Sequence, residues 1–273
     1  MKQTKAQLSP VPAEISGRHN RPVGAGPLRG LADLIPDLDN IVIIGGGGKT
    51  GLMEVLEEEF RTAGRTVLTT VTTRLGREQL PHLDRVEAGT RAEAEDAARR
   101  AAAGERLLLA GPFTPDNLSQ DKLAGLPLEW FPAVRQALPE EAVLLIEADG
   151  SAGRALKCHR DYEPVLPPRP YFMVAVLGLS ALTRPWAETV HRPEILRRYI
   201  SPPPEDQSLS PAQVADFVKA AWAGLQPDLI FLNQADVLTD ATRPLGWELA
   251  DRLAAGGFRT AIGSLHGRYL WET

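Results

Sequence analysis

Short runs of apolar residues alternate with segments of helical apolar spacing along most of this chain. The runs that we expect to form strands are 40–44, 66–70, 85–87, 106–110, 143–147, 171–177, 228–232 and 259–263. The expected helices are 28–35, 50–63, 91–103, 211–224 and 245–255, with loop and helix over 111–141. This alternation predicts an α/β fold with a doubly wound, mainly parallel sheet flanked by helices, whose ligands bind at the carboxyl ends of the strands.

The first 27 residues lack this periodicity. Prolines and glycines such as Pro10 and Gly24 are frequent there, and no apolar spacing is sustained. We therefore expect residues 1–27 to be a disordered tail. A chain of 273 residues with 43% apolar content can bury one large core, so we expect residues 28–273 to form a single domain.

A run of glycines stands between the first expected strand and the helix that follows it: Gly45, Gly46, Gly47 and Gly48. Glycine leaves backbone N–H groups open to a phosphate, and the helix start adds partial positive charge. Lys49 is placed to reach terminal phosphates and Thr50 to bind magnesium. The sequence therefore predicts a P-loop NTPase-like domain that binds a nucleoside triphosphate and Mg²⁺.

The glycine loop is shorter than a full Walker A loop. The pattern G-x-x-x-x-G-K-[ST] requires glycine at position 43, where this chain has Ile43. Shorter loops of the G-x-x-G-K-T kind also occur in nucleotide-binding proteins, and the loop resembles that of the Mur ligases. The alternative is a glycine-rich hairpin with an incidental lysine, but the strand before it and the helix after it favour phosphate binding.

Two acidic residues, one at the end of the run at 143–147 and one two residues later, are placed in the manner of a Walker B element. A carboxylate at the end of a buried strand can hold the hydration shell of Mg²⁺ opposite the P-loop threonine. The sequence leaves open whether Glu147 or Asp149 faces the metal, because Gly150 indicates that the chain is already turning. We expect Thr50 and Asp149 to position the metal and Glu147 to orient an attacking water.

Hydroxyl side chains gather at the end of the second expected strand, at 69–73. Thr72 and Thr73 are candidates for binding phosphate or the water shell of magnesium. The alternative is that these residues are present for their β-propensity alone.

Asn233 and Asp236 follow another buried run in an N-x-x-D pattern. In GTPases, an N-K-x-D element reads guanine because its aspartate accepts from the ring N–H and the amino group. Here Gln234 stands where that lysine belongs. The position of the pattern at a strand end, with 263–264 after the next strand, favours GTP slightly over ATP.

The segment 150–168 is a long polar excursion from the carboxyl end of the sheet, where functional loops often lie. Cys158 stands beside Lys157, so its thiol pKa could be lowered, although a small residue without chemistry is the alternative. The tetrad at 191–194 fits a helix start with proline in first position, and its Arg192 is also a candidate second cation for a nucleotide or partner.

Bulk properties narrow the classes of partner. A net charge of −5 and a pI near 5.6 argue against a nucleic-acid or membrane-surface binder. No apolar run is long enough to span a bilayer, and the chain starts without an apolar signal core. The single cysteine fits a reducing compartment, so we expect a cytoplasmic protein.

Six blocks occur here in the same order as in the YqeC family, and over residues 28–265 the chain resembles that family. The blocks are 45–50, 69–73, 147–151, 156–167, 191–194 and Asn233 with Asp236. The resemblance implies an accessory protein of selenium-dependent molybdenum hydroxylases. The resemblance implies a P-loop NTPase of the same broad kind as the GTPases that help to mature urease and hydrogenase, which carry a segment similar to Glu147–Gly150.

The resemblance further implies a role in making or inserting a selenium-containing cofactor. The expected partners are a nucleotide and a protein client, which is the molybdenum hydroxylase or its maturation machinery. Lys49, Glu147 and Asp149 are the expected catalytic residues. The alternatives are an ATP-dependent kinase or ligase that acts on a small anionic substrate held by the basic segment 154–160, and a module that binds a nucleotide or cofactor without hydrolysis.

Overall fold

The computed structural model describes residues 30–36, 39–112, 122–267 and 269–272. The predicted tail at 1–27 lies outside these residues, as does the start of the predicted helix at 28–35. The described part of that helix forms only a short 3-10 turn, η2 (Ala32–Leu34).

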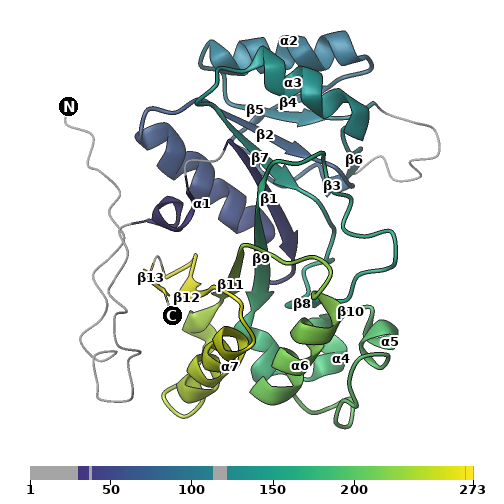
Figure 1. Cartoon of the computed structure of the whole chain (residues 1–273), viewed down its shortest axis with the longest axis vertical. Coiled ribbons are helices and arrows are strands. Elements are labelled where there is room, and N and C mark those ends of the chain that lie inside the picture. Colours follow the sequence, from purple (N-terminus) through teal and green to yellow (C-terminus); the bar gives the residue numbers. More distant parts are fainter. Residues whose placement is uncertain (1–29, 37–38, 113–121, 268, 273) are drawn as a thin grey trace.

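The described residues form one large sheet (Figure 1). Its strands, in spatial order, are β13 (Tyr269–Glu272), β12 (Thr260–Ser264), β11 (Leu229–Asn233), β9 (Phe172–Gly178), β1 (Asn40–Gly45), β7 (Val143–Glu147), β2 (Val67–Val71), β5 (Leu107–Ala110) and β4 (Asp84–Glu87). Every neighbouring pair is parallel except β12 with β13. The predicted doubly wound, mainly parallel sheet is confirmed.

The central strands consist mainly of apolar residues because both of their faces are buried. In β1, Val42 and Ile44 belong to one hydrophobic cluster, whereas Ile41 and Ile43 belong to the cluster on the opposite face. Successive side chains of a strand point to opposite faces, so a strand covered on both sides needs an unbroken apolar run. This explains why the apolar runs located the strands well.

Helices cover both faces of the sheet. Helix α1 (Lys49–Thr62) packs on one face together with η2. The opposite face is covered by α2 (Arg91–Ala102), α3 (Phe131–Ala137), α6 (Pro211–Ala221) and α7 (Arg243–Ala255). Helix α6 begins as predicted, because Ser210 and Gln213 form a reciprocal capping box at its first turn.

The helix start predicted at 191–194 is confirmed by α5 (Pro193–Leu196), which has Pro193 in its first position. Several other short elements were not predicted. They are β3 (Leu75–Gly76) paired with β6 (Lys122–Leu123), β8 (Leu156–Lys157) paired with β10 (Val190–His191), α4 (Trp186–Thr189), η3 (Leu128–Trp130), η4 (Leu179–Leu182) and η5 (Ala235–Val237). Strands of two residues are too short to show an alternating pattern. The antiparallel edge strand β13 was also missed.

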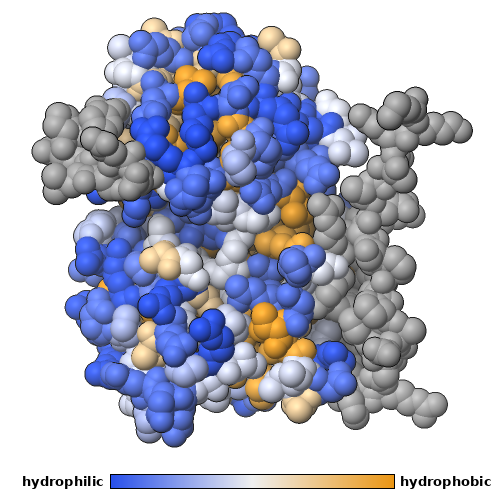
Figure 2. Space-filling view, turned by 180° about the vertical axis from the view of Figure 1, so that it is seen from behind, coloured by the Kyte–Doolittle hydropathy of each residue, from blue (hydrophilic) through white to orange (hydrophobic). Residues whose placement is uncertain are grey.

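The surface opposite to the view of Figure 1 is mostly hydrophilic, with small separated hydrophobic patches (Figure 2). Large hydrophobic side chains exposed within the described part of the chain are Tyr162, Tyr199 and Val237. Among the helices described, none has the length and apolar character needed to cross a membrane.

Candidate functional site

The carboxyl ends of neighbouring strands bring most of the predicted site residues to one edge of the sheet. Strand β1 ends in Gly45 and leads through the glycine loop into α1, β7 ends in Glu147, and β11 ends in Asn233. Because β1 lies between β7 and β9, and β11 lies beyond β9, these ends are adjacent. Thr72 follows β2 on the other side of β7.

The four glycines of the loop have neighbouring atoms so close that none of them has space for a side chain. Gly45, Gly47 and Gly48 have positive φ angles of 97°, 79° and 124°. A Cβ at any of the four would lie under 3.0 Å from a neighbouring atom; the neighbours of Gly45, Gly46, Gly47 and Gly48 are Val176, Arg154, Gly178 and Asn233, respectively. The interpretation that these glycines only open the backbone to phosphate is therefore incomplete, because internal packing requires them too.

The first N–H groups of the loop already have acceptors. Those of Gly45, Gly46 and Gly47 donate to Asp149 Oδ2 at 2.8 Å, the Val176 carbonyl at 2.9 Å and the Arg154 carbonyl at 2.8 Å, respectively. The first N–H groups of a helix have no partner inside the helix, and they carry the positive end of its dipole. The donors left for a phosphate are therefore those at the start of α1, from Gly48 onward.

Lys49 is buried, and its ammonium lies among oxygen atoms at the sheet edge. Its Nζ is 3.1 Å from Asp149 Oδ1, 3.7 Å from Glu147 Oε1, 2.9 Å from the Gly45 carbonyl and 3.3 Å from Ser151 Oγ. Burial by itself would lower the pKa of Lys49, but the two carboxylates raise that pKa above its ordinary value. Lys49 is therefore held in its charged form.

The two carboxylates have different environments. Burial raises the pKa of Glu147 to about 6, against the opposing effect of Lys49. For Asp149 burial acts in the same direction, but Lys49 and a hydrogen bond with His159 overcome it and lower the pKa to about 2. Its Oδ2 lies 2.6 Å from His159 Nε2 and also accepts from Gly45. Asp149 is therefore tied to three parts of the chain at once.

Glu147 is the carboxylate that interacts with Thr50. A hydrogen bond with the Thr50 hydroxyl acts to lower the pKa of Glu147. The same hydroxyl accepts a hydrogen bond from Gln79 Nε2 at 2.9 Å. Glu147 Oε2 is buried without a hydrogen-bond donor among the described residues. A buried carboxylate oxygen without a donor, beside a threonine hydroxyl, fits a hard divalent cation such as Mg²⁺.

Within the described ranges, no group of three or more His, Cys, Asp or Glu residues is arranged to hold a metal ion. Mg²⁺ in nucleotide sites takes most of its ligands from phosphates and water. The donor set here therefore fits a cation that arrives together with a nucleotide.

Thr72 links its strand end to the segment 150–168. Its hydroxyl donates to the carbonyl of Val165 at 2.6 Å, and its N–H donates to the carbonyl of Glu147 at 3.0 Å. Thr73 follows it and is half-buried. Phosphate binding by Thr72 and Thr73 remains a prediction, and the contacts of Thr72 in this structure are with the backbone.

Asn233 connects the glycine loop to the loop after β12. Its Nδ2 donates to the carbonyl of Gly47 at 2.7 Å, and its Oδ1 accepts from the N–H of Leu265 at 3.1 Å. Asp236 accepts from Ser264 Oγ at 2.5 Å and remains exposed. The loop at 233–236 and the end of β12 at 263–264 therefore meet beside the P-loop.

Gln234 adopts a left-handed backbone conformation with a φ of 68°. Its Oε1 accepts from Ser180 Oγ at 2.7 Å and lies where Gly178 has no Cβ. Ser180 belongs to η4, far away in the chain, so the sequence carried no signal for this contact. This hydrogen bond fixes the amide group of Gln234 at the edge of a large cavity.

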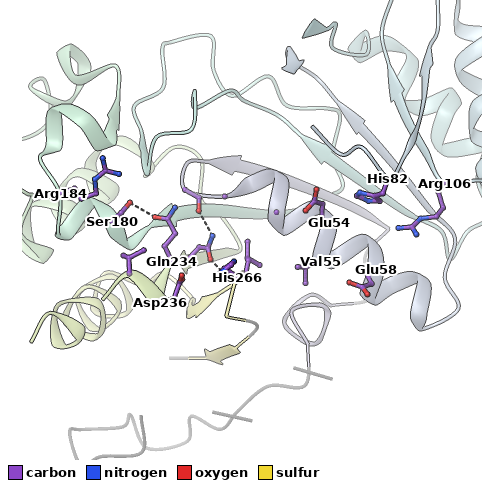
Figure 3. A pocket seen from close by; sticks show the side chains of 16 residues that line it. Glu54, Val55, Glu58, His82, Arg106, Ser180, Arg184, Gln234, Asp236 and His266 are labelled. Carbon is purple, nitrogen blue, oxygen red and sulfur yellow. Dashed lines mark hydrogen bonds between the residues drawn. The ribbon is translucent and has the colours of Figure 1, made fainter. Parts of the chain in front are cut away.

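A cavity of about 940 Å³ lies beside the glycine loop and the loop after β11 (Figure 3), and Lys49, Thr50, Glu147 and Asp149 are not among the residues that line it. One end is lined by Gly47, Gly48 and Gly51 of the loop and helix start, together with the loop at 233–237 and its neighbours Leu265 and His266. The cavity then continues along α1, past Glu54 and Glu58, to His82 and Arg106. The start of a helix, with its partial positive charge, thus opens into a cavity that also presents the Asp236 side chain.

The segment 150–168 is less solvent-exposed than its polar sequence suggested. Lys157 is buried, and its Nζ donates to the Gly150 carbonyl at 2.6 Å and lies 3.1 Å from Glu163 Oε2. Arg192 forms hydrogen bonds with the same Glu163 carboxylate. The interpretation of Arg192 and Lys157 as cations available to a ligand is thus not supported, because both neutralise Glu163.

Cys158 is buried within the same segment, and burial raises its thiol pKa to about 12. The suggestion of a lowered thiol pKa is wrong, because the loss of hydration outweighs the lowering effect of the Lys157 charge. Cys158 is a packed side chain of the core.

Comparison with known proteins agrees with the first five blocks found in the sequence, whereas the sixth, Asn233 with Asp236, lies outside the matched residues. The family described as YqeC protein matches residues 41–194. An uncharacterized protein YqeC of Escherichia coli (strain K12) is 34% identical over 153 residues, which are 56% of this chain and 57% of that relative. The matched region thus spans little more than half of the relative's length. Chloroplast FtsY from Physcomitrella patens matches over 82% of this chain and 58% of its own, with 14% identity and a TM-score of 0.32, too low to inform the argument.

Proposed function

Because this chain belongs to the YqeC family, we propose that it is a nucleotide-binding accessory protein that hydrolyses a nucleoside triphosphate with Mg²⁺. The observation that carries the proposal is the cavity that runs from the start of α1 to the loop at 233–237. That cavity joins donors suited to phosphates with a carboxylate suited to a base.

In this proposal, each residue at the sheet edge has a separate role in binding or hydrolysing the nucleotide. The N–H groups at the start of α1 bind the phosphates, and Lys49 neutralises charge on the terminal phosphoryl group. Thr50 and Glu147 would hold Mg²⁺, which would offset the negative charge of the phosphates when bound. Asp149 holds the Gly45 N–H and the Lys49 ammonium in position. This assignment moves the expected metal-binding role from Asp149 to Glu147, since Thr50 interacts with Glu147.

The base lies between the loop at 233–237 and the loop that contains Leu265 and His266. Asp236 offers a carboxylate oxygen to the ring N–H and the amino group of guanine. Adenine has no such adjacent pair of donors, so the site favours GTP over ATP. Asn233 supports this end indirectly, by tying both loops to Gly47.

The proposed cellular role rests on the family resemblance. The protein would serve the maturation of selenium-dependent molybdenum hydroxylases, and hydrolysis would reset the segment 150–168 to change its contact with a protein client. The support in the structure is the hydrogen bond of Gly47 to Arg154, which links that segment directly to the P-loop.

Titration calorimetry with GDP, GTP, ADP and ATP in the presence of Mg²⁺ tests nucleotide binding and base choice together. We expect GDP to bind more tightly than ADP, and Asp236→Asn to weaken GDP at least about tenfold while leaving ADP unchanged, because a charged acceptor for two guanine donors is lost. The matched control is Asp240→Asn, which changes a 93% exposed carboxylate outside the cavity. Equal affinity for both bases would remove the role given to Asp236.

One observation supports a second function. The cavity continues beyond the nucleotide end to Glu54, Glu58 and Arg106, which leaves space for a second small substrate, as a kinase or an ATP-dependent ligase would need. Product analysis separates the two functions. Phosphate release without an acceptor supports nucleotide hydrolysis, and turnover that requires an acceptor supports phosphoryl transfer or ligation. Tight binding without turnover, even with client proteins present, would indicate a binding module.

A further inference from the structure

The residues 151–155, called here the 151–155 segment, lie directly against the P-loop. The carbonyl of Arg154 accepts from the N–H of Gly47 at 2.8 Å, and the carbonyl of Ala155 accepts from the N–H of Gly178 at 2.9 Å. A Cβ added to Gly46 would meet the same Arg154 carbonyl. The segment therefore covers the loop on the side of the β7 carboxylates, away from the open cavity.

Lys49 is closed off by the same segment. An ammonium has three N–H donors, and Nζ of Lys49 has hydrogen-bond or ion-pair distances to the Gly45 carbonyl, Ser151 Oγ and Asp149 Oδ1. The side chain is only 4% exposed. A terminal phosphate would have to replace at least one of these partners, and Ser151 is the one that belongs to the covering segment.

The other side of the P-loop is open. Gly48 and Gly51, at the start of α1, line the cavity together with the loop at 233–237. A nucleotide that enters from this side can place its inner phosphates on the helix start without moving any part of the 151–155 segment. Inner phosphates can therefore bind without displacement of the 151–155 segment, whereas a terminal phosphate at Lys49 requires that displacement.

The backbone of the segment holds this closed position with two unusual residues. Ala152 has a φ of 50° and Gly153 a φ of 72°, both in the left-handed region. Both residues are exposed, and a Cβ added to Gly153 would meet nothing within 4 Å. Substitutions here therefore alter the preference for the closed conformation with little change in side-chain packing.

We infer that the 151–155 segment decides how many phosphates the site accepts. In the closed position the site takes a nucleoside diphosphate, and a triphosphate binds only after the segment leaves Gly47 and Lys49. The inference rests on the proposed function, because it concerns the same nucleotide site. Apparent triphosphate affinity is then reduced by the small fraction of molecules in which the segment is open.

Two neighbouring substitutions test this with opposite expected signs. Gly153→Ala disfavours the left-handed conformation and should raise the affinity for a non-hydrolysable triphosphate analogue about fivefold. Ala152→Gly relieves a side chain in that conformation and should lower the same affinity about fivefold. Affinity for the diphosphate should stay within about twofold in both variants, because that ligand does not require the segment to open.

The measurement is calorimetric titration of the full chain and both variants with GDP and with the triphosphate analogue, after thermal unfolding has verified that each is folded. A ratio of triphosphate to diphosphate affinity that moves in opposite directions in the two variants supports the inference. An unchanged ratio in folded variants overturns it while leaving the proposed function intact. If the unmodified chain binds neither nucleotide, the proposed function itself fails. Should Gly153→Ala not fold, the predicted decrease for Ala152→Gly still decides the matter.

Discussion

Replacing Lys49 with methionine is expected to lower the free energy of unfolding by about 3–5 kcal/mol, because it removes the cation from between two buried carboxylates. Asp149 is 0% exposed and Glu147 only 7%, so water cannot replace the ammonium without a change in the structure. Methionine fills a similar volume, so the loss measures the charge more than a cavity. The measurement is chemical denaturation at neutral pH.

The same variant should become relatively more stable as the pH falls. Without the ammonium, the pKa of Glu147, which burial already raises to about 6, rises further, and the pKa of Asp149 rises from about 2, because burial favours the neutral acid. The folded variant then binds more protons than the unfolded chain at intermediate pH, so its stability decreases as the pH rises through that range. The deficit relative to the unmodified protein is therefore expected to be smaller at pH 5 than at pH 8.

Lys219→Met is the matched control, since Lys219 is an exposed lysine of α6, and it should change stability by no more than about 0.5 kcal/mol. A Lys49→Met variant as stable as this control would show that the carboxylates do not depend on Lys49. The result also matters for ligand binding, because loss of nucleotide affinity in a Lys49 variant is informative only at a temperature where the variant is folded.

The sequence was sufficient for the parts of the site that depend on strand ends. The apolar runs before Gly45, Glu147 and Asn233 marked buried parallel strands, and the carboxyl ends of parallel strands share one edge of a sheet. The approach of these residues therefore followed from their positions in the chain. The glycine run identified the loop for the same reason, since it stands where a strand turns into a helix.

The contacts that assign a role to each site residue could not be predicted from the sequence, because each of them joins residues that are far apart in the chain. The choice between Glu147 and Asp149 depends on which side chain reaches Thr50, and a strand end next to Gly150 does not fix that. The burial of Lys157 depends on the β8–β10 pair and on Glu163. A partial signal was available there, because Ala155, Leu156 and Cys158 are small or apolar residues in an otherwise polar segment, consistent with a buried strand.

Gly47→Ala is expected to cost about 2–4 kcal/mol of stability and more than about tenfold in nucleotide affinity. Gly47 has a φ of 79°, and an added Cβ would press on the backbone of Gly178, which cannot move as a flexible side chain could. The hydrogen bonds of Gly47 to Arg154 and Asn233 would shift with it. Both the covering segment and the base end of the cavity would therefore be displaced by one methyl group.

Gly64→Ala separates the two causes of this loss. Gly64 has a φ of 85°, close to that of Gly47, but a Cβ there would have nothing within 4 Å. It should therefore cost only about 1 kcal/mol, the conformational part, and leave nucleotide affinity unchanged. Denaturation and calorimetric titration of both variants give the comparison. If the two cost the same, the close packing around the P-loop relaxes freely, and the glycine at position 47 is needed only for its backbone angle; if Gly47→Ala alone is severe, packing against β9 and the 151–155 segment is what holds the loop in its phosphate-binding shape.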